Sequence, residues 1–251
     1  MPSAKEIVMK PIESGRANDL MRDLHYSGKV VNNSQLHIGV FLHGKLEGAL
    51  QFGPPLDKRK VLPLVEDTEW NGMMELNRMA FSDNLPRNSE SRALGVAMTL
   101  MEKHAPHVEW ILSYADATQC GDGTIYRAAN FVLTGIKENK QMVKMPDGEV
   151  IPQSVITAAG HNGSPPLRKK MDDKYGTDLY KSTSPSVLEL IEAGGEWMKG
   201  YQLRYIYFIN DDARDRLTVP EIPYEKIDEV GAGMYRGERV PYEERNQAPE
   251  A

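Results

Sequence analysis

Apolar and polar residues follow one another along this chain in two periods, one typical of strands and one typical of helices. Residues 36–42 and 46–52 are apolar, partly alternating runs joined by a His-Gly-Lys turn, which predicts a β-hairpin. In residues 89–103, apolar side chains recur at helical spacing after a cap at Asn88 or Ser89, which predicts an amphipathic helix. Strand and helix patterns alternate in this way through most of the chain, so the sequence predicts an α/β domain.

The predicted elements follow the order β-α-β-β-β-α-β-α-β, then an insertion, then a last strand. The pattern predicts further helices at residues 15–25, 125–131 and 186–193 and further strands at 5–13, 73–81, 110–115, 131–136, 140–145 and 201–209. Residues 146–200 have no clear period over most of their length, so we expect an irregular insertion there. We expect one domain over residues 1–224 and a polar, poorly ordered tail over 225–251.

The clearest chemical signal lies in residues 109–131. An almost continuous apolar run predicts a strand buried on both faces of a sheet, and a polar, glycine-containing loop and a short helix follow it. Polar turns at the C-terminal ends of strands are where α/β proteins place their ligands. Ser113 and Asp116 on the strand and Tyr126 on the helix are therefore candidate functional residues. The alternative interpretation is an ordinary strand-to-helix connection.

Composition limits the class of protein without naming a substrate. The chain has 251 residues, of which 40% are hydrophobic and 26% charged, which is typical of a soluble globular domain. The net charge of −6 argues against a broadly basic nucleic-acid coat. Half of that charge lies in residues 225–251, however, so the remaining body can still carry a local basic groove. Overall charge therefore neither supports nor excludes a DNA substrate.

Cysteine usage and hydropathy point to the cytoplasm. Cys120 is the only cysteine, which excludes an intramolecular disulfide and a Cys-cluster metal site. No apolar run is long enough to span a bilayer, and the N-terminus lacks the apolar core of a signal peptide. No histidine is fixed near Cys120 by the sequence, so it is a weak candidate nucleophile.

Three segments resemble one known family, the phage Mom proteins. They are H-Y-S-G at residues 25–28, E-L-N-R-M-A-F-S-D-N-L-P-R-N-S-E-S-R-A-L at 75–94, and S-Y-A-D-A-T-Q-C-G-D-G-T-I-Y-R-A-A-N-F at 113–131. The resemblance spans roughly residues 15–210. It implies a GNAT-like mixed central sheet with helices on both faces. It also implies an enzyme that converts adenine in double-stranded DNA to N6-carbamoylmethyladenine and so protects phage DNA from restriction in the host cytoplasm, without a membrane partner.

The donor site follows from the same resemblance. Residues 126–131 resemble the L-Y-x-x-x-G-F helix of GNAT acyltransferases, with Asn where Gly is usual. Those enzymes bind the phosphates of the donor through an R-G-x-G-x-G/A loop, whereas residues 87–92 read R-N-S-E-S-R without glycine, which leaves coenzyme A open as donor. The residues expected to bind the cofactor are Asn77, Arg78, Arg87, Ser89 and Ser91. Of Asn77 and Arg78, strand alternation should turn one toward the site and the other away.

The family's product bears on the donor as well. Acetyl transfer from acetyl-CoA to adenine N6 would give an N-acetyl amide, whereas a carbamoylmethyl group on N6 is a glycinamide unit. Glycyl-tRNA supplies that unit in fewer steps. N6 attacks the ester carbonyl, the glycyl amine attacks C6, and the five-membered spiro intermediate opens to leave the former glycine nitrogen on C6. Acetyl-CoA and glycyl-tRNA both remain candidate donors.

Catalysis at N6 needs a base and an acid. Asp116 is the first candidate for the base, and Tyr126 for the acid that protonates the leaving group or holds the oxyanion. Further candidates for proton transfer and hydrogen bonding are His25, Tyr26, Ser27 and Ser113. A metal site built from His25, Asp116 and a third ligand stays open, although no ligand spacing supports it.

Duplex DNA must present N6 to such a site, which suggests a flipped adenine and phosphate contacts from a basic groove. Gln119 and Asp122 are candidates for reading the adenine edge. The groove candidates are Arg168, Lys169 and Lys170, followed by Lys174 and then the cluster at residues 58–60. Two other functions stay open, a conventional acetyl-CoA N-acetyltransferase for a small amine or protein and a non-catalytic DNA-binding scaffold. The oligomeric state is not predicted.

Overall fold

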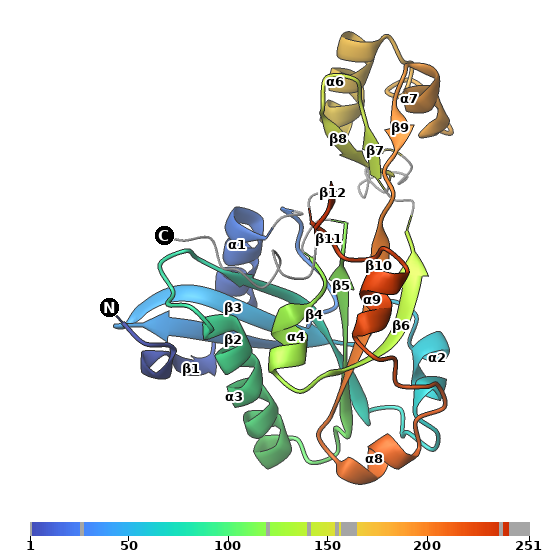
Figure 1. The fold of residues 1–251 in the computed structure, drawn as a ribbon. Helices are drawn as coiled ribbons and strands as arrows, with labels where there is room; N and C mark the ends of the chain where they lie inside the picture. The colour runs from blue at the N-terminus through green and yellow to red at the C-terminus, as the bar shows by residue number, and fades with distance from the viewer. Residues whose placement is uncertain are drawn as a thin grey trace.

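The computed structural model describes residues 2–25, 28–118, 121–139, 142–153, 156, 165–235 and 238–240. Its centre is a seven-stranded sheet with the order β1-β2-β3-β4-β5-β10-β6 (Figure 1). β4 and β5 are parallel, and the other neighbours in this sheet are antiparallel. The strands are β1 (Val8–Pro11), β2 (Leu36–Leu42), β3 (Lys45–Gly53), β4 (Met73–Phe81), β5 (Trp110–Asp116), β6 (Val132–Glu138) and β10 (Tyr201–Phe208).

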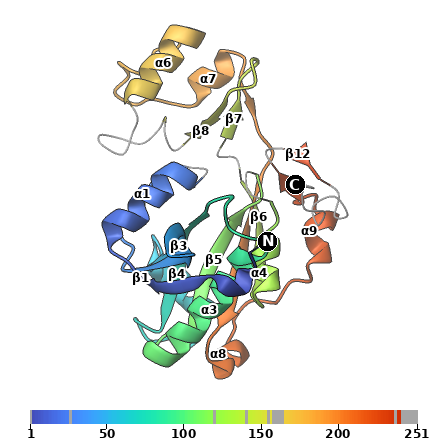
Figure 2. The same ribbon diagram turned by 90° about the vertical axis from the view of Figure 1, so that its left-hand side faces the viewer.

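Helices cover both faces of the sheet (Figures 1 and 2). One face, which we call the α1 face, is covered by α1 (Ser14–Leu24), α2 (Lys58–Val61), the 3-10 turn η2 (Leu62–Leu64) and α8 (Asp211–Asp215). The other, the α3 face, is covered by α3 (Ser89–His104), α4 (Thr124–Ala128) and α9 (Glu225–Glu229). A short 3-10 turn, η1 (Ala4–Glu6), precedes β1. The GNAT-like mixed sheet with helices on both faces is therefore confirmed.

Local sequence explains the best-predicted elements. The β2–β3 hairpin turns through His43 and Gly44, whose φ angles of 49° and 81° are both positive, as the tight turns that match strand twist require. In α3, Ala93, Leu94 and Ala97 are fully buried against the sheet. These are the apolar positions that predict the helix, so the hairpin and α3 are both confirmed.

β4 and β5 pair only at their beginnings. Met73–Glu75 pairs with Trp110–Leu112, after which β4 stays with β3 and β5 stays with β10. A bulge at Asn77 adds to the divergence, because Phe52 pairs with Leu76 while Gln51 pairs with Arg78. Residues 76–81 of β4 and 113–116 of β5 are therefore not paired with one another. We call this the divergent segment.

The described part of the insertion contains regular elements, whereas the sequence analysis expected an irregular segment over most of its length. It holds β7 (Met142–Lys144), β8 (Val150–Pro152), α6 (Pro165–Tyr175), α7 (Leu188–Glu192) and β9 (Glu196–Trp197), with a small sheet in the order β8-β7-β9. Val143, Ile151, Met171 and Leu190 form a core of its own. The insertion rises from the ends of β6 and β10 that lie beside the end of β5 (Figure 1). β7 and α7 correspond to the strand predicted at residues 140–145 and the helix predicted at 186–193, whereas β8, β9 and α6 were not predicted.

The predicted polar tail also needs correction over residues 225–235. Ile227, Ala232 and Met234 are buried in the main core, and Tyr201 Oη donates to the carbonyl of Val230 at 2.9 Å. β11 (Met234–Tyr235) pairs with β12 (Glu238–Arg239). Residues 241–251 lie outside the described part of the chain. Among the helices that the structure describes, none has the length and apolar character needed to cross a bilayer.

Candidate active site

Strand alternation divides the candidate residues between the two faces of the sheet. Glu75 pairs beside Leu112, whose side chain joins the core under α8, so Glu75, Tyr114 and Asp116 belong to the α1 face. The bulge at Asn77 returns Arg78 to the same face, because Arg78 pairs with Gln51, which hydrogen bonds Asn18 of α1. Ser113 lies on the α3 face, opposite Tyr205 of β10.

His25 and Arg78, predicted as a catalytic and a cofactor-binding residue respectively, lie close enough on the α1 face for the charge of Arg78 to act on the imidazole. His25 follows the end of α1, and its backbone N–H donates to the carbonyl of Met21 at 3.2 Å. Burial, and then the charge of Arg78, lower the pKa of His25 to about 4. The imidazole is therefore neutral at pH 7, where it is a weak base and can take part in hydrogen bonds. Tyr26 and Ser27 lie outside the described residues.

Within the described residues, the guanidinium of Arg78 makes only part of the hydrogen bonds that it can make. Its Nη1 donates to the carbonyl of Asn77 at 2.8 Å. Its Nε is buried without a hydrogen-bond partner, considering the described residues alone. A buried guanidinium N–H without a partner is costly, so it marks a position where a ligand acceptor would be stabilised.

Glu75 is a site residue that the sequence analysis missed. It is half-buried at the last pair of β4 with β5. Burial raises the pKa of its carboxyl to about 7, although Asn77 and the charge of Arg78 both act to lower it. Burial, and then the charge of Glu75, raise the pKa of Tyr114, while Arg204 acts to lower it. A carboxyl group in an otherwise apolar strand start was the available signal, and its face is set by pairing beside Leu112, which the sequence does not show.

Asp116 ends β5 and starts the loop after it. Its Oδ1 accepts a hydrogen bond from the backbone N–H of Thr118 at 3.0 Å. The loop is held against β10, because Ala117 N–H donates to the carbonyl of Tyr201 at 2.9 Å. Gly200 also packs so closely here that an added Cβ would lie 1.9 Å from Thr118 Oγ1. Gln119 and Cys120, which follow, lie outside the described residues.

Tyr126 packs inside the α3 face. Its side chain is buried, with ring centroids 5.4 Å from Phe131 and 5.3 Å from Tyr205. Asn130 has a φ of 64°, so it takes the left-handed conformation that glycine takes in the related helix motif. Ser113 on the same face is fully buried, and among the described residues its Oγ has no hydrogen-bond partner. Ser113 thus remains a candidate hydrogen-bond donor to a ligand.

Asp122 stabilises the start of α4, a role that the sequence did not indicate. It is only 5% exposed, and its Oδ1 accepts from both the backbone N–H and the hydroxyl of Thr124, at 3.1 and 2.7 Å. Its carbonyl accepts the hydroxyl of Tyr205. These contacts hold the start of α4, so the predicted reading of the adenine edge by Asp122 needs correction.

The donor residues separate into two groups. Arg87 and Ser91 line a recess of about 880 Å³ at the N-terminus of α3, where Asn88 has a φ of 68°. Its other lining residues include Pro2, Ser3, Lys5 and Arg92. Cations beside a helix N-terminus suit an anionic group such as a phosphate. This recess therefore fits the phosphates of coenzyme A or of an RNA equally well.

Ser89 and Asn77 belong to the structure rather than to this recess, which corrects their prediction as donor residues. Ser89 is fully buried, and its Oγ donates to the carbonyl of Pro86 at 2.6 Å. Asn77 is 7% exposed, accepts from Ser34 Oγ at 3.0 Å and donates to the carbonyl of Pro54 at 3.3 Å. Both side chains fix neighbouring loops.

The predicted groove cations of α6 are paired within the insertion. Arg168 is 8% exposed and its Nε donates to the carbonyl of Ile156 at 2.9 Å, so a role for Arg168 in DNA contact needs correction. Lys169 Nζ lies 2.9 Å from Asp173 Oδ2 on the helix surface. Exposed pairs of this kind are weak, so Lys169 can still exchange its partner for a phosphate.

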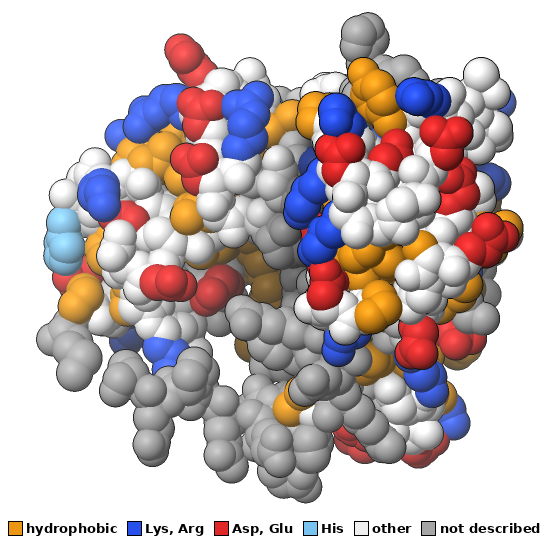
Figure 3. Space-filling view, turned by 90° about the horizontal axis from the view of Figure 1, so that it is seen from above, with side chains coloured by type: hydrophobic (Ala, Val, Ile, Leu, Met, Phe, Trp, Pro, Cys, Tyr) orange, Lys and Arg blue, Asp and Glu red, His pale blue; other side chains and the backbone are white. Residues whose placement is uncertain are grey.

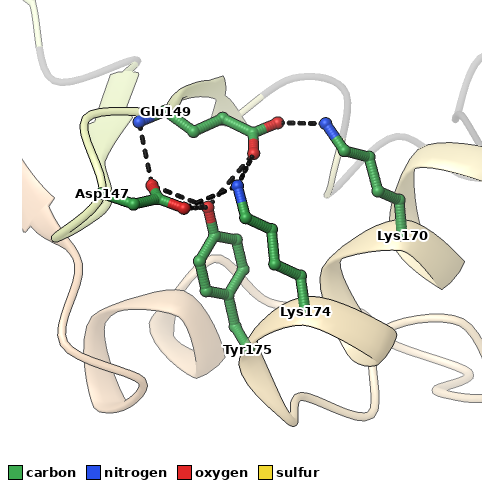
Figure 4. Close-up of polar contacts among 5 residues, drawn as sticks. All are labelled: Asp147, Glu149, Lys170, Lys174 and Tyr175. Carbon is green, nitrogen blue, oxygen red and sulfur yellow. Dashed lines mark hydrogen bonds and ion pairs between the residues drawn. The ribbon is translucent and has the colours of Figure 1, made fainter.

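Lys170 and Lys174 belong to a charged network (Figure 4). Lys170 lies 2.6 Å from Glu149, and Lys174 lies 2.5 Å from Asp147 and 2.7 Å from Glu149. Tyr175 Oη lies 3.0 Å from both carboxylate oxygens of Asp147. The pKa of the Asp147 carboxyl is lowered to about 2, chiefly by the hydrogen bond from Lys174. Seen from above, the surface is hollowed beside the insertion, and Lys and Arg side chains gather on that border (Figure 3).

The second basic cluster lies elsewhere. Lys58 lies over the ring of Trp70, 5.1 Å from its centroid, and Lys60 pairs with Asp57 at 2.8 Å. Lys58 and Trp70 line a recess of about 840 Å³ together with Met73, the first residue of β4. This cluster is therefore at the opposite end of β4 from the divergent segment. Within the described ranges, no group of three or more His, Cys, Asp and Glu is placed to hold a metal ion.

The sheet order, the divergence of two parallel strands and the helix after each of them define a GNAT-like transferase fold. Similar solved structures include a GNAT family acetyltransferase from Elizabethkingia anophelis with acetyl-CoA bound, at 9% identity and a TM-score of 0.41, covering 81% of this chain and 98% of that one. Another is the spermidine/spermine N-acetyltransferase SpeG from Vibrio cholerae, at 8% identity and a TM-score of 0.41, covering 84% and 98%.

Sequence comparison places the chain more narrowly. Residues 6–226 match the Mom protein family. The chain is also 35% identical over 216 residues to the methylcarbamoylase Mom of Escherichia phage Mu, covering 86% of this chain and 80% of that protein. The chain therefore belongs to the Mom protein family, which confirms the resemblance carried by its motifs.

Proposed function

We propose that this protein converts adenine in double-stranded DNA to N6-carbamoylmethyladenine by acyl or aminoacyl transfer to N6, and thereby protects phage DNA from restriction. The observation that carries the proposal is the family match over residues 6–226 together with the 35% identity to a methylcarbamoylase. The candidate site supports it, because polar groups lie on both faces of the divergent segment and its edge, Glu75 and Arg78 on the α1 face and Ser113 on the α3 face.

The donor is proposed to be a glycyl ester of tRNA, with acetyl-CoA as the alternative. In the first step the N6–carbonyl carbon bond forms, the ester C–O bond breaks, and the leaving oxygen takes a proton. In the second, the glycyl amine bonds to C6 and the former C6–N6 bond breaks, which leaves a primary amide on the CH2 group. The recess at Arg87, Ser91 and Arg92 offers cations to a phosphate of either donor.

The acceptor is proposed to be a flipped adenine that reaches the divergent segment from the side of the insertion. Lys and Arg side chains stand among Asp and Glu side chains on the insertion's side of the hollow (Figure 3), and the cations suit a DNA backbone. Neutral His25 can accept a hydrogen bond from the adenine, and Tyr126 is the proposed acid for the leaving oxygen. The proposed location is the host cytoplasm, where phage DNA meets restriction enzymes.

Mass spectrometry of nucleosides tests the function. DNA incubated with the protein, charged glycyl-tRNA and carbon-labelled glycine should yield a labelled, heavier deoxyadenosine. Parallel reactions with labelled acetyl-CoA separate the donors, since label that arrives only from acetyl-CoA would overturn the glycyl route. Unmodified DNA with release of free thiol from acetyl-CoA in the presence of an amine would instead indicate a conventional N-acetyltransferase. Unmodified DNA with every donor, together with DNA binding, would indicate a non-catalytic scaffold.

A further inference from the structure

The position of Glu75 sets it apart from the other carboxyl groups of the protein. It is the last residue of β4 that pairs with β5, so its side chain lies where the two strands begin to diverge. It is half-buried rather than sealed in the core. A group bound between the diverging strands would therefore meet the Glu75 carboxyl on the α1 face.

The groups around Glu75 stabilise its ionised carboxylate less than burial destabilises it. Asn77 and Arg78 on β4 favour its ionised form, yet burial outweighs them and raises its pKa to about 7. Tyr114 on β5 and, beyond it, Arg204 on β10 face the same region. By contrast, Glu47 has a pKa lowered to about 2, chiefly by hydrogen bonds from Lys45, Ser82 and Asn84. A carboxyl group that titrates near neutral pH is suited to accept and release a proton during turnover.

Asp116 is a weaker choice for the same task. One of its carboxylate oxygens already accepts the backbone N–H of Thr118 and so closes the turn after β5. This hydrogen bond ties the Asp116 carboxylate to the loop after β5. Removing Asp116 would therefore disturb the loop whether or not it moves a proton.

We propose that Glu75 is the base that accepts a proton from adenine N6 as N6 attacks the donor carbonyl. The proposal rests on the proposed function and assigns a residue to it. One N6–H bond breaks and its proton passes to the Glu75 carboxylate, while the N6–carbon bond forms and the leaving oxygen of the glycyl ester departs and takes a proton. Asp116 is then a positioning residue for the loop.

The pH dependence of modification by Glu75→Gln tests the proposal. Initial rates of labelled deoxyadenosine formation are measured with saturating glycyl-tRNA between about pH 5.5 and 9. For the unaltered protein kcat/KM should rise with pH through the titration of Glu75 and then level off. Glu75→Gln should lose roughly 10²–10⁴-fold in rate, the usual contribution of a positioned base, and the rising limb should disappear. Glu75→Asp should recover part of the rate and keep a rising limb.

Glu102→Gln is the matched control, because Glu102 is an exposed residue of α3 and loses the same charge. It should keep both the rate and the pH profile of the unaltered protein. Thermal unfolding of each variant shows that it is folded. If Glu75→Gln retains the rate within about threefold, or keeps the rising limb, the base is another group and the proposal is wrong. If the unaltered protein forms no modified deoxyadenosine, the proposed function fails as well.

Discussion

Replacing Glu75 by Gln should change how the stability of the protein depends on pH. Burial raises the pKa of Glu75 from 4.5 to about 7 in the folded protein. Between these values the folded state keeps a proton that the unfolded chain has released, so the free energy of unfolding falls as pH rises. A shift of this size corresponds to about 3 kcal/mol, lost progressively across the window and fully lost above neutral pH.

Glutamine keeps the shape of the side chain but cannot ionise. The difference in free energy of unfolding between Glu75→Gln and the unaltered protein should therefore grow by about 3 kcal/mol from low to neutral pH, in favour of the variant. His25 has the opposite effect, because its pKa falls from 6.5 to about 4 on folding and stability rises with pH through that range. It is present in both proteins, so its contribution cancels in the difference.

Urea unfolding at a series of pH values measures this difference. The fluorescence of Trp110, which is fully buried with its Nε1 donating to Thr68 Oγ1 at 3.0 Å, reports the transition. Linear extrapolation gives the free energy for each protein at each pH. A difference that stays constant between about pH 5 and 8 would refute the reasoning, because a lost hydrogen bond shifts stability equally at every pH whereas a lost titration does not.

Three other predictions use separate parts of the chain. Arg87→Ala should raise the donor KM about 2–5-fold with little change in kcat, because one cation leaves the recess at α3. Steady-state kinetics measure this change, and Lys103→Ala, at an exposed position of α3, is the control. Gly200→Ala should cost about 1–3 kcal/mol in urea unfolding, since its Cβ would lie 1.9 Å from Thr118 Oγ1, and adding Thr118→Ala should recover part of the loss. Lys174→Met should raise the pKa of Asp147 from about 2 toward its ordinary value, followed by carboxyl NMR titration, with an unchanged pKa contradicting the network.

Sequence periodicity succeeded where one element buries one continuous stripe. The β2–β3 hairpin and α3 have such stripes, and both match their predicted ranges closely. In the insertion it found β7 and α7 but missed β8, β9 and α6, where the core is completed by positions distant in the sequence such as Met171 and Leu190. It also failed near the C-terminus, where Ile227 stands among charged neighbours and Met234 follows a glycine, and where burial depends on the rest of the fold.

The sequence identified only part of the candidate site, because the burial of a side chain depends on the whole fold. Motifs identified His25 and Arg78, which the structure does bring together. Residue type alone could not distinguish exposed from buried polar groups, so Arg168 and Asp122 were read as ligand contacts although both are buried and hydrogen bonded inside the protein. Glu75 escaped notice because its face and its burial depend on pairing with β5, which no local pattern shows. The bulge at Asn77 changes only the residues after it, such as Arg78.

The proposed base and the proposed acid lie on opposite faces of the sheet near β5. Glu75, Arg78 and neutral His25 lie on the α1 face, whereas Ser113 and Tyr126 lie on the α3 face, beside the helices that follow β4 and β5. In the proposed reaction the nucleophile gives up a proton and the leaving oxygen gains one, on opposite sides of the carbonyl carbon. A carbonyl placed between the diverging strands would have the base on one side and the acid on the other. The donor would then enter from the α3 recess and the adenine from the α1 side, so neither substrate has to pass the other to react.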